Sequence, residues 1–392
     1  MIGLGQFKND NVLYKTIYPE NLCNELQVSK GYLLLDVRSK GEYSDTSSSP
    51  VYNLGHLQDA MNIDVGELGK KLLEISAYKN KPVYVYCSHS QRSRRASKML
   101  ADSGFTNIIN VNGGVTAIRQ LPEENCLNNF LVTNVSYKII AAMALCKKLT
   151  GDTGKLFLLD VRSDSAFRHI DLAANVNALG TFKNSINIPL ANLKKRIAEI
   201  PVGKEIIVMD LFGADAAQAA VILAENKYQH ISILLEGVSR MHYGDSRELT
   251  CLKSNYISPV KYHLISSVDF KRFIDKNPDY LSLDIRSPEE FANKHKDYWK
   301  NIGHLVNAIN IPVDQLAGNI SSIEKLKNKP VIIYAFSGSK EAHEAAIILM
   351  NKGFTNVNVL TGGLFNIRWT AGNVHGYAQL GKLVVDVPAQ NL

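Results

Sequence analysis

The chain repeats one pattern three times, and this constrains its fold more than any other feature of the sequence. A Leu-Leu-Asp-Val-Arg-Ser segment at 34–39 returns at 158–163, and again as Ser-Leu-Asp-Ile-Arg-Ser at 282–287, so the Asp recurs at intervals of 124 residues (36 to 160 and 160 to 284). In each copy a Gly downstream of this motif is followed seven residues later by Asn-Ile, so the internal spacing of this second motif is identical in all three. A period of this length can form its own core, so the repeat predicts tandem domains rather than a solenoid.

The domain boundaries follow from stretches in which the pattern stops. At about 150 residues per domain, the 392 residues of the chain fit two to three domains, and the repeat favours three. Polar stretches that contain Pro or Gly separate the copies at 121–134 and 241–258. We therefore predict domains at 1–129, 130–256 and 257–392.

Each copy alternates short apolar runs with segments of helical period. In the first copy the run Val83–Tyr86 predicts a strand, and Ala96, Met99 and Leu100 at i, i+3 and i+4 predict a helix that begins shortly beyond residue 91. This alternation is typical of βαβ units. The predicted fold class is α/β, with a mainly parallel sheet and helices on both faces in every domain.

The charge balance leaves the class of partner open. A net charge of +7 fits anionic small molecules and polyanions equally well, but no strip of basic and aromatic residues suggests nucleic-acid binding. The most apolar helical stretch, around 139–146, is far shorter than the roughly 20 residues of a membrane span, so no membrane partner is expected. The first ten residues lack the features of a secretory signal, and we expect a cytoplasmic protein.

Five cysteines are spread along the chain without a metal-binding or disulfide pattern. Their number is odd, no two form a Cys-x-x-Cys pair, and none belongs to a Cys/His cluster; they are Cys23, Cys87, Cys126, Cys146 and Cys251. We expect neither a metal site nor another cofactor, no disulfide framework, and a reducing compartment.

One junction distinguishes the first copy from the other two. The second copy begins this junction with Asp210 and the third with Ala335, so neither has a thiol there. In the first copy the strand is followed by Cys87, Ser88, His89, Ser90, Gln91, Arg92 and Ser93. Thiol chemistry at this place is therefore predicted for the first copy alone.

The position of Cys87 suits a reactive thiolate. The carboxyl end of a parallel strand is where such sheets bind ligands, and loop amides with a helix N-terminus stabilise a thiolate or a bound anion. Arg92 adds a guanidinium whose fork suits oxyanions. The residue pattern thus predicts an anion-binding thiolate site.

Several motifs of the first copy resemble a rhodanese domain, and the resemblance extends over the chain as three copies. They are the Asp-Val-Arg-Ser segment, Gly55-His56-Leu57 with Asn62-Ile63, Cys87 with Arg92-Ser93, and Gly113-Gly114. The resemblance implies a sulfurtransferase in which the Cys87 thiolate takes the outer sulfur of thiosulfate or a persulfide donor. The Cys87 persulfide would pass its sulfur to a thiol or cyanide acceptor, including an acceptor protein. It also implies that Arg92 binds the small anionic donor and that the loop amides of Ser88, His89, Ser90, Gln91 and Ser93 cradle the sulfur.

Two alternatives to sulfur transfer stay open. Dual-specificity phosphatases of the cell-cycle type have five residues between the Cys and the Arg of a similar loop, whereas four separate Cys87 from Arg92. A shorter loop makes a tighter cup, which fits one sulfur atom better than a phosphoryl group. A non-catalytic binding or scaffold protein is the other alternative, because two of the three loops lack a nucleophile. The second and third domains could also restrict access to Cys87 or position an acceptor protein.

Residues shared with the thiol-free copies are interpreted as structural. Asp36 and Arg38 recur in both, which indicates an ion pair or a strand-end hydrogen bond, and His56 recurs as His304. For His89, tuning of the thiolate, contact with the acceptor and an exposed side chain without a role all stay open.

Two positions in the loops depart from the expected pattern. Similar loops often carry Gly where Ser90 stands, because glycine tolerates tight backbone conformations. The third loop is expected to be one residue longer than the others, so either Lys340 or Glu341 takes the place of the arginine.

Overall fold

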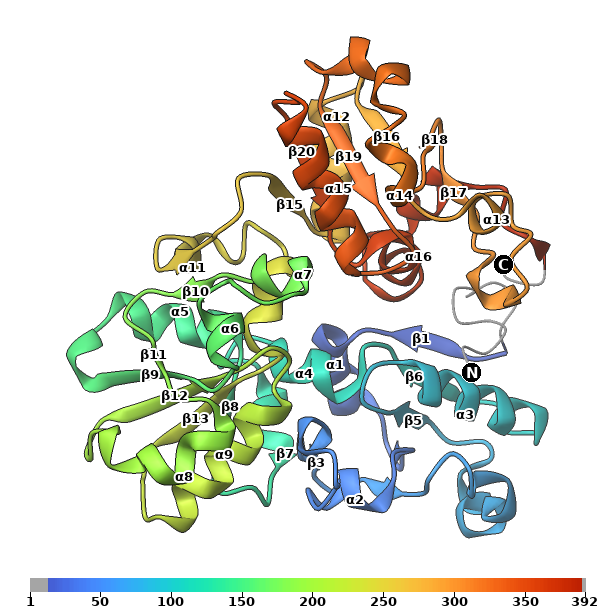
Figure 1. Cartoon of the computed structure of the whole chain (residues 1–392). Coiled ribbons are helices and arrows are strands. Elements are labelled where there is room, and N and C mark those ends of the chain that lie inside the picture. The colour runs from blue at the N-terminus through green and yellow to red at the C-terminus, as the bar shows by residue number, and fades with distance from the viewer. Residues whose placement is uncertain (1–12, 390–392) are drawn as a thin grey trace. The chain divides into compact units, whose positions relative to one another are not determined.

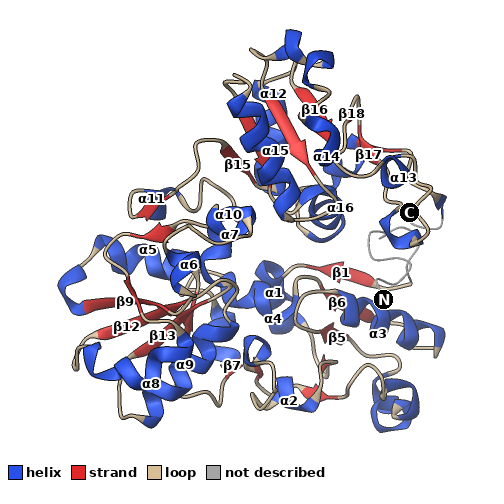
Figure 2. Ribbon diagram, in the orientation of Figure 1, coloured by secondary structure: helices blue, strands red, loops and turns tan. Residues whose placement is uncertain are grey.

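The computed structural model describes residues 13–389, and three five-stranded sheets organise them (Figure 1). Each sheet lies within one repeat, and all of its strand pairs are parallel. Helices connect the strands along the chain (Figure 2). The predicted α/β class with mainly parallel sheets is confirmed.

The first copy has the strand order β1-β6-β5-β2-β4 in its sheet. The predicted strand at 83–86 is β5, and the predicted helix after it begins at Gln91. The elements are β1 (Lys15–Ile17), α1 (Pro19–Val28), β2 (Leu33–Asp36), α2 (Lys40–Tyr43), β3 (His56–Leu57), β4 (Met61–Asn62), β5 (Val83–Tyr86), α3 (Gln91–Asp102), β6 (Ile108–Val111), α4 (Gly114–Gln120) and β7 (Leu131–Val132).

The second copy repeats this order as β8-β13-β12-β9-β11, taken from the corresponding edge of its sheet. Its elements are β8 (Lys138–Ile140), α5 (Ala142–Thr150), β9 (Leu156–Asp160), α6 (Asp164–Phe167), α7 (Ala174–Asn177), β10 (Thr181–Phe182), β11 (Ile186–Asn187), α8 (Leu193–Arg196), β12 (Glu205–Met209), α9 (Ala214–Glu225), β13 (Ile231–Leu234), α10 (Arg240–Tyr243), α11 (Thr250–Lys253) and β14 (Tyr256–Ile257).

The third copy has the order β15-β20-β19-β16-β18. Its elements are β15 (His263–Ile265), α12 (Ser267–Lys276), β16 (Leu281–Asp284), α13 (Pro288–Phe291), β17 (His304–Leu305), β18 (Ile309–Asn310), α14 (Val313–Leu316), β19 (Val331–Tyr334), α15 (Lys340–Asn351), β20 (Val357–Leu360), α16 (Gly363–Asn373) and β21 (Val384–Val385).

A short antiparallel pair closes each copy. β7 pairs with β3, β14 with β10, and β21 with β17. Strands β7 and β14 lie at 131–132 and 256–257, at or just beyond the boundaries drawn from the sequence. The pairing therefore assigns these few residues to the copy that precedes them.

The described residues group into two compact units. One contains residues 13–162 and 184–237, and the other contains 163–183 and 238–389. The sheets of the first and second copies both belong to the former unit. The junction that carries Cys87 lies within this unit.

Helices cover both faces of the first sheet. On one face Val83 and Val85 of β5 pack with Leu100 of α3, and on the other Tyr84 and Tyr86 pack in a cluster that includes residues of α1 and α4. Successive strand residues point to opposite faces, so a strand that is apolar at every position is expected in a sheet buried on both sides. This packing holds the carboxyl end of β5 in place.

No helix between residues 13 and 389 combines the length and the apolar character that crossing a bilayer requires.

Candidate functional site

Cys87 directly follows the last residue of β5, and its side chain is buried. The sulfur lies 3.6 Å from the hydroxyl oxygen of Ser93 in α3. That hydroxyl in turn donates a hydrogen bond to the carbonyl of Ser90, 3.0 Å away. Within the described residues Cys87 is the free cysteine. The strand end and the first turn of α3 thus enclose one reduced thiol.

Ser90 fits its place without the conformation that favours glycine. Its φ is 166°, which is extended backbone, whereas Gly213 at the same position of the second copy has a left-handed φ of 105°. The Ser90 hydroxyl accepts a hydrogen bond from the amide of Gly113 at 2.8 Å and donates one to the carbonyl of His89. The serine therefore ties the loop to the start of α4, which a glycine could not do.

Two further hydrogen bonds fix the loop to α4. The amide of Val115 donates to the carbonyl of Cys87 at 2.9 Å, and the amide of Thr116 donates to the carbonyl of Ser88 at 3.0 Å. The backbone on which the thiol sits is therefore anchored at consecutive residues.

His89 projects from the loop with an exposed side chain. Its Nδ1 lies 3.1 Å from the hydroxyl of Ser88, and its Nε2 lies 3.5 Å from the hydroxyl of Thr116. Partial desolvation by the surrounding protein lowers its pKa, and the nearby carboxylates of Glu236 and Glu42 oppose this shift. The neutral imidazole is therefore favoured. Gln91 is exposed as the first residue of α3.

Arg92 makes a two-pronged ion pair with Glu42. Its Nη1 lies 2.5 Å from Oε2 and its Nη2 lies 2.7 Å from Oε1, while Nη2 also donates to the hydroxyl of Ser88 at 2.9 Å. Burial lowers the pKa of Arg92, but the hydrogen bonds and charge of Glu42 raise it by more. Glu42 is not predicted from the sequence as part of the site, because no local pattern connects two residues that are 50 positions apart.

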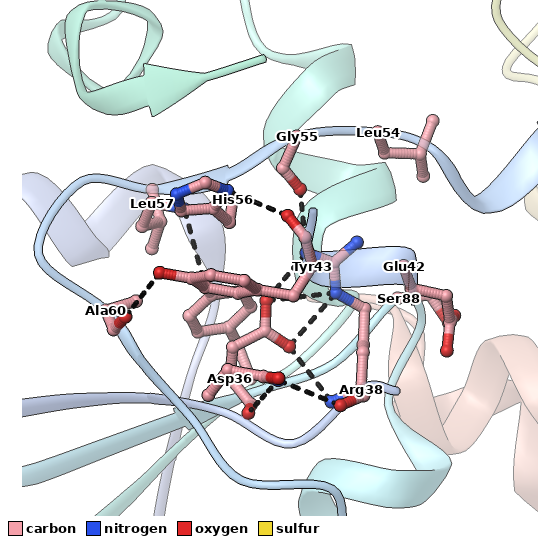
Figure 3. Close-up of polar contacts among 12 residues, drawn as sticks. Asp36, Arg38, Glu42, Tyr43, Leu54, Gly55, His56, Leu57, Ala60 and Ser88 are labelled. Carbon is pink, nitrogen blue, oxygen red and sulfur yellow. Dashed lines mark hydrogen bonds and ion pairs between the residues drawn. The ribbon is translucent and has the colours of Figure 1, made fainter. Parts of the chain in front are cut away.

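Asp36 and Arg38 form the structural ion pair that the sequence predicts (Figure 3). The Arg38 Nη2 lies 2.6 Å from the Asp36 Oδ2 and also donates to the carbonyl of Gly55 at 2.7 Å. The same pairing recurs in the second and third copies. His56 is likewise structural, because its ring stacks on Tyr43 with centroids 3.9 Å apart and its Nδ1 lies 2.9 Å from the Tyr43 carbonyl.

In the second copy the side chain of Asp210 occupies the place of the thiol. Its carboxylate accepts hydrogen bonds from the amides of Gly213, Asp215 and Ala216. Burial raises the pKa of Asp210 to about 6, although these hydrogen bonds oppose the shift. The loop of the second copy is therefore filled by its own carboxylate.

In the third copy the loop is covered by other parts of the chain. A Cβ added at Gly338 would lie 2.5 Å from the Tyr243 hydroxyl, and the side-chain amide of Asn175 donates to the Gly338 carbonyl at 3.3 Å. Helix α15 begins six positions after the end of β19, whereas α3 and α9 begin five positions after theirs. The longer loop is confirmed, and Glu341 takes the second helical position that Arg92 has in α3.

The expectation of no disulfide is wrong for Cys23 and Cys126, which are bonded to each other. Cys23 lies in α1 and Cys126 follows α4, 103 residues later. The fold packs these elements together, and no spacing in the sequence predicts such a contact. The cytoplasmic location stays a prediction.

Residues 13–389 contain no group of three or more His, Cys, Asp or Glu side chains placed to hold a metal ion. The loop of the first copy brings together the side chains or backbone groups of Cys87, Ser88, Ser90, Arg92 and Ser93.

Comparison with known proteins gives one family along the chain. The family model described as Rhodanese-like domain matches residues 20–121, 143–242 and 267–368. An uncharacterised protein of Bacillus subtilis, YqhL, is 38% identical over 81 residues, which are 21% of this chain and 56% of YqhL, so the chain spans about half of that relative. The Escherichia coli thiosulfate sulfurtransferase PspE is 29% identical over 79 residues, which are 20% of this chain and 76% of PspE.

One solved structure matches about a quarter of the chain. The rhodanese-like domain protein of Staphylococcus aureus is 26% identical, and the match covers 26% of this chain and 90% of that protein with a TM-score of 0.22.

Proposed function

The chain belongs to the rhodanese family, and on that premise we propose that it is a sulfurtransferase whose first domain carries sulfur as a persulfide on Cys87. The single observation that carries the proposal is the free thiol at the end of β5, enclosed by the first turn of α3. The corresponding positions of the other two domains hold Asp210 and Ala335. The transfer chemistry is therefore assigned to the first domain.

The proposed reaction has two balanced steps. The Cys87 thiolate attacks the outer sulfur of thiosulfate, the S–S bond breaks, and its electron pair leaves with sulfite. A persulfide donor reacts in the same way and leaves as a thiolate. The Cys87 persulfide then gives its outer sulfur to a thiolate or cyanide acceptor, and the Cys87 thiolate is regenerated. No oxidant or reductant is needed.

The second domain supports the idea that such a loop receives an anion. There the Asp210 carboxylate accepts three amide hydrogen bonds from the loop and the start of α9. Counted from the strand end, these amides correspond to those of Ser90, Arg92 and Ser93 in the first domain. Amides arranged in this way would stabilise the negative outer sulfur of a persulfide.

A binding or scaffold role is the second candidate for the chain. It is favoured by the silent loops, one filled by Asp210 and the other covered by Tyr243 and Asn175. In this alternative the rhodanese fold presents a surface to a partner, and Cys87 stays reduced.

Intact mass spectrometry under non-reducing conditions distinguishes the two candidates. The wild-type protein is incubated with thiosulfate, and we expect it to gain the mass of one sulfur atom, which cyanide then removes. Cys87→Ser should gain nothing, because the attacking thiolate is missing. Asp210→Ser serves as the matched control in a loop without a thiol and should load like the wild type. A wild type that gains no sulfur from thiosulfate or from cysteine persulfide would favour the scaffold role.

A further inference from the structure

The guanidinium of Arg92 already has a carboxylate partner. Both of its terminal nitrogens contact Glu42, and one of them also donates to the hydroxyl of Ser88. This two-point geometry is the one that a guanidinium uses for a sulfonate or another oxyanion. An anionic donor therefore meets a guanidinium whose Nη1–Nη2 edge already holds a carboxylate.

Glu42 is held firmly in this position. It is the third residue of α2, and its Oε2 accepts hydrogen bonds from the amide and the hydroxyl of Ser39 at 3.1 and 2.9 Å. The Glu42 side chain is 7% exposed and that of Arg92 is 31% exposed. Burial raises the pKa of Glu42, but the contacts with Arg92 and Ser39 outweigh it and lower the pKa. The carboxylate is charged at neutral pH, and its withdrawal would break four hydrogen bonds.

The Glu42–Arg92 ion pair is found in the domain that carries the thiol. The positions that correspond to Glu42 and Arg92 are Ala166 and Asp215 in the second domain and Glu290 and Glu341 in the third. Neither of the two domains without the thiol can form such a pair between these two positions. A purely structural device would be expected to recur, as the Asp36–Arg38 pair does in all three copies.

The two classes of sulfur donor depend differently on Arg92. Thiosulfate carries two negative charges, and its sulfonate oxygens need a cationic partner outside the loop that encloses the transferred sulfur. In a persulfide the negative charge is on the terminal sulfur, which is the atom transferred to Cys87. Compensation of the Arg92 charge by Glu42 therefore weakens the binding of thiosulfate more than the binding of a persulfide.

We propose that Glu42 determines donor specificity by occupying the guanidinium of Arg92, so that the site prefers thiol persulfides to thiosulfate. This inference rests on the proposed sulfurtransferase function. In the favoured step the Cys87 thiolate attacks the terminal sulfur of R–S–S⁻. The S–S bond of the donor breaks, its electron pair leaves with R–S⁻, and Cys87 retains the sulfur as its persulfide. Glu42 is thus a positioning residue that acts through Arg92.

The test compares the rate of Cys87 persulfide formation with thiosulfate and with cysteine persulfide. In Glu42→Gln we expect kcat/KM for thiosulfate, divided by that for cysteine persulfide, to rise roughly ten-fold, mainly through a lower KM for thiosulfate. The exposed carboxylate of Glu67 pairs with Lys70, so Glu67→Gln removes the same charge away from the site. This control should leave the ratio within about two-fold of the wild-type value.

A second pair of variants keeps the proposal open to refutation. Glu42→Asp retains the charge but is one methylene shorter, and we expect a smaller rise in the same direction. Adding Arg92→Gln to Glu42→Gln should abolish the rise, because the gain depends on a released guanidinium. An unchanged ratio in both Glu42 variants, or variants that load neither donor, would show that the pair is structural and overturn the proposal. A wild type that loads neither donor would instead refute the sulfurtransferase function itself.

Discussion

The backbone of Gly114 lies against the carbonyl oxygen of Cys87, so closely that a Cβ at Gly114 would stand 2.1 Å from that oxygen. The φ of Gly114 is +57°, a conformation that L side chains rarely adopt. The third domain repeats the arrangement between Gly363, whose φ is +59°, and the carbonyl of Ala335 at 2.5 Å. In the first domain this close approach fixes the residue that carries the thiol.

Gly114→Ala should therefore impair the site directly. Because the obstacle is a backbone carbonyl, no side-chain rotation can relieve the clash, and the loop must move. We expect a loss of about 2–4 kcal/mol in the free energy of unfolding and slower loading of Cys87 by roughly ten-fold or more. Intact mass spectrometry after timed exposure to a sulfur donor measures the loading rate.

Gly363→Ala is the matched control, because it introduces the same strain in a domain without a thiol. It should destabilise the third domain to a similar extent and leave the loading of Cys87 within about two-fold of the wild-type rate. Equal loss of loading in both variants would contradict a local role for Gly114.

The buried ion pair of the third domain offers a test of stability away from the candidate site. Arg286 lies 2.6 Å from Asp284 and also donates to the carbonyl of Gly303, with both charged side chains almost fully buried. Asp284→Asn leaves the guanidinium without its counter-charge, which should cost about 3–5 kcal/mol. Urea unfolding monitored by hydrogen exchange of peptides from the third domain measures the loss.

The control for this variant is an exposed ion pair on the same domain. Glu344 pairs with Lys340 at the surface of α15. Glu344→Gln should change the free energy of unfolding by less than about 1 kcal/mol. If Asp284→Asn were as mild as Glu344→Gln, the recurring Asp-Arg motif would not be the structural element inferred from its repetition.

His343 predicts an acid sensitivity of the third domain. Its side chain is buried, its Nδ1 lies 2.9 Å from the hydroxyl of Tyr262, and burial lowers its pKa to about 4. The unfolded chain takes up a proton near pH 6.5 and the folded chain does not, so the unfolded state binds more protons between these values. The contribution of neutral His343 to the free energy of unfolding is complete above pH 6.5 and is lost as the pH falls toward 4.

The size of this contribution is about 3 kcal/mol, from a difference of roughly two and a half pKa units at 1.36 kcal/mol each. His343→Gln cannot titrate and should flatten the decline in third-domain stability between pH 6.5 and 4, as measured by urea unfolding at each pH. An equally steep decline in the variant would exclude His343 as its source.

The predictable part of this molecule is local in sequence. The strand Val83–Tyr86, the helix after it and the position of Cys87 all follow from patterns within about 20 residues, because period and order along the chain decide them. The repeat adds the structural roles of Asp36 and Arg38, since a residue kept where the thiol is absent serves the fold.

The part that could not be predicted depends on distant contacts. Glu42 meets Arg92 across 50 residues, and Cys23 meets Cys126 across 103, only after the sheet has formed. Ser90 is an intermediate case, because its hydrogen bond with Gly113 depends on where α4 begins. The residue types of the loop predict the thiol chemistry that it can support. Which partners its side chains have is decided only by packing.

The disulfide between Cys23 and Cys126 should stabilise the first domain without taking part in its chemistry. It closes a loop with a sequence separation of 103 residues, and constraining the unfolded chain over such a loop contributes about 2–5 kcal/mol. The double variant Cys23→Ala/Cys126→Ala should lose this stability, seen as faster hydrogen exchange in peptides of α1, while Cys87 still gains one sulfur atom from the donor. Alkylation of the wild-type protein in urea provides the independent check, because Cys87 should react without a reductant whereas Cys23 and Cys126 should react only after reduction. Labelling of Cys23 and Cys126 without a reductant would contradict the disulfide, and failure of the double variant to load sulfur would give the pair a role beyond stability.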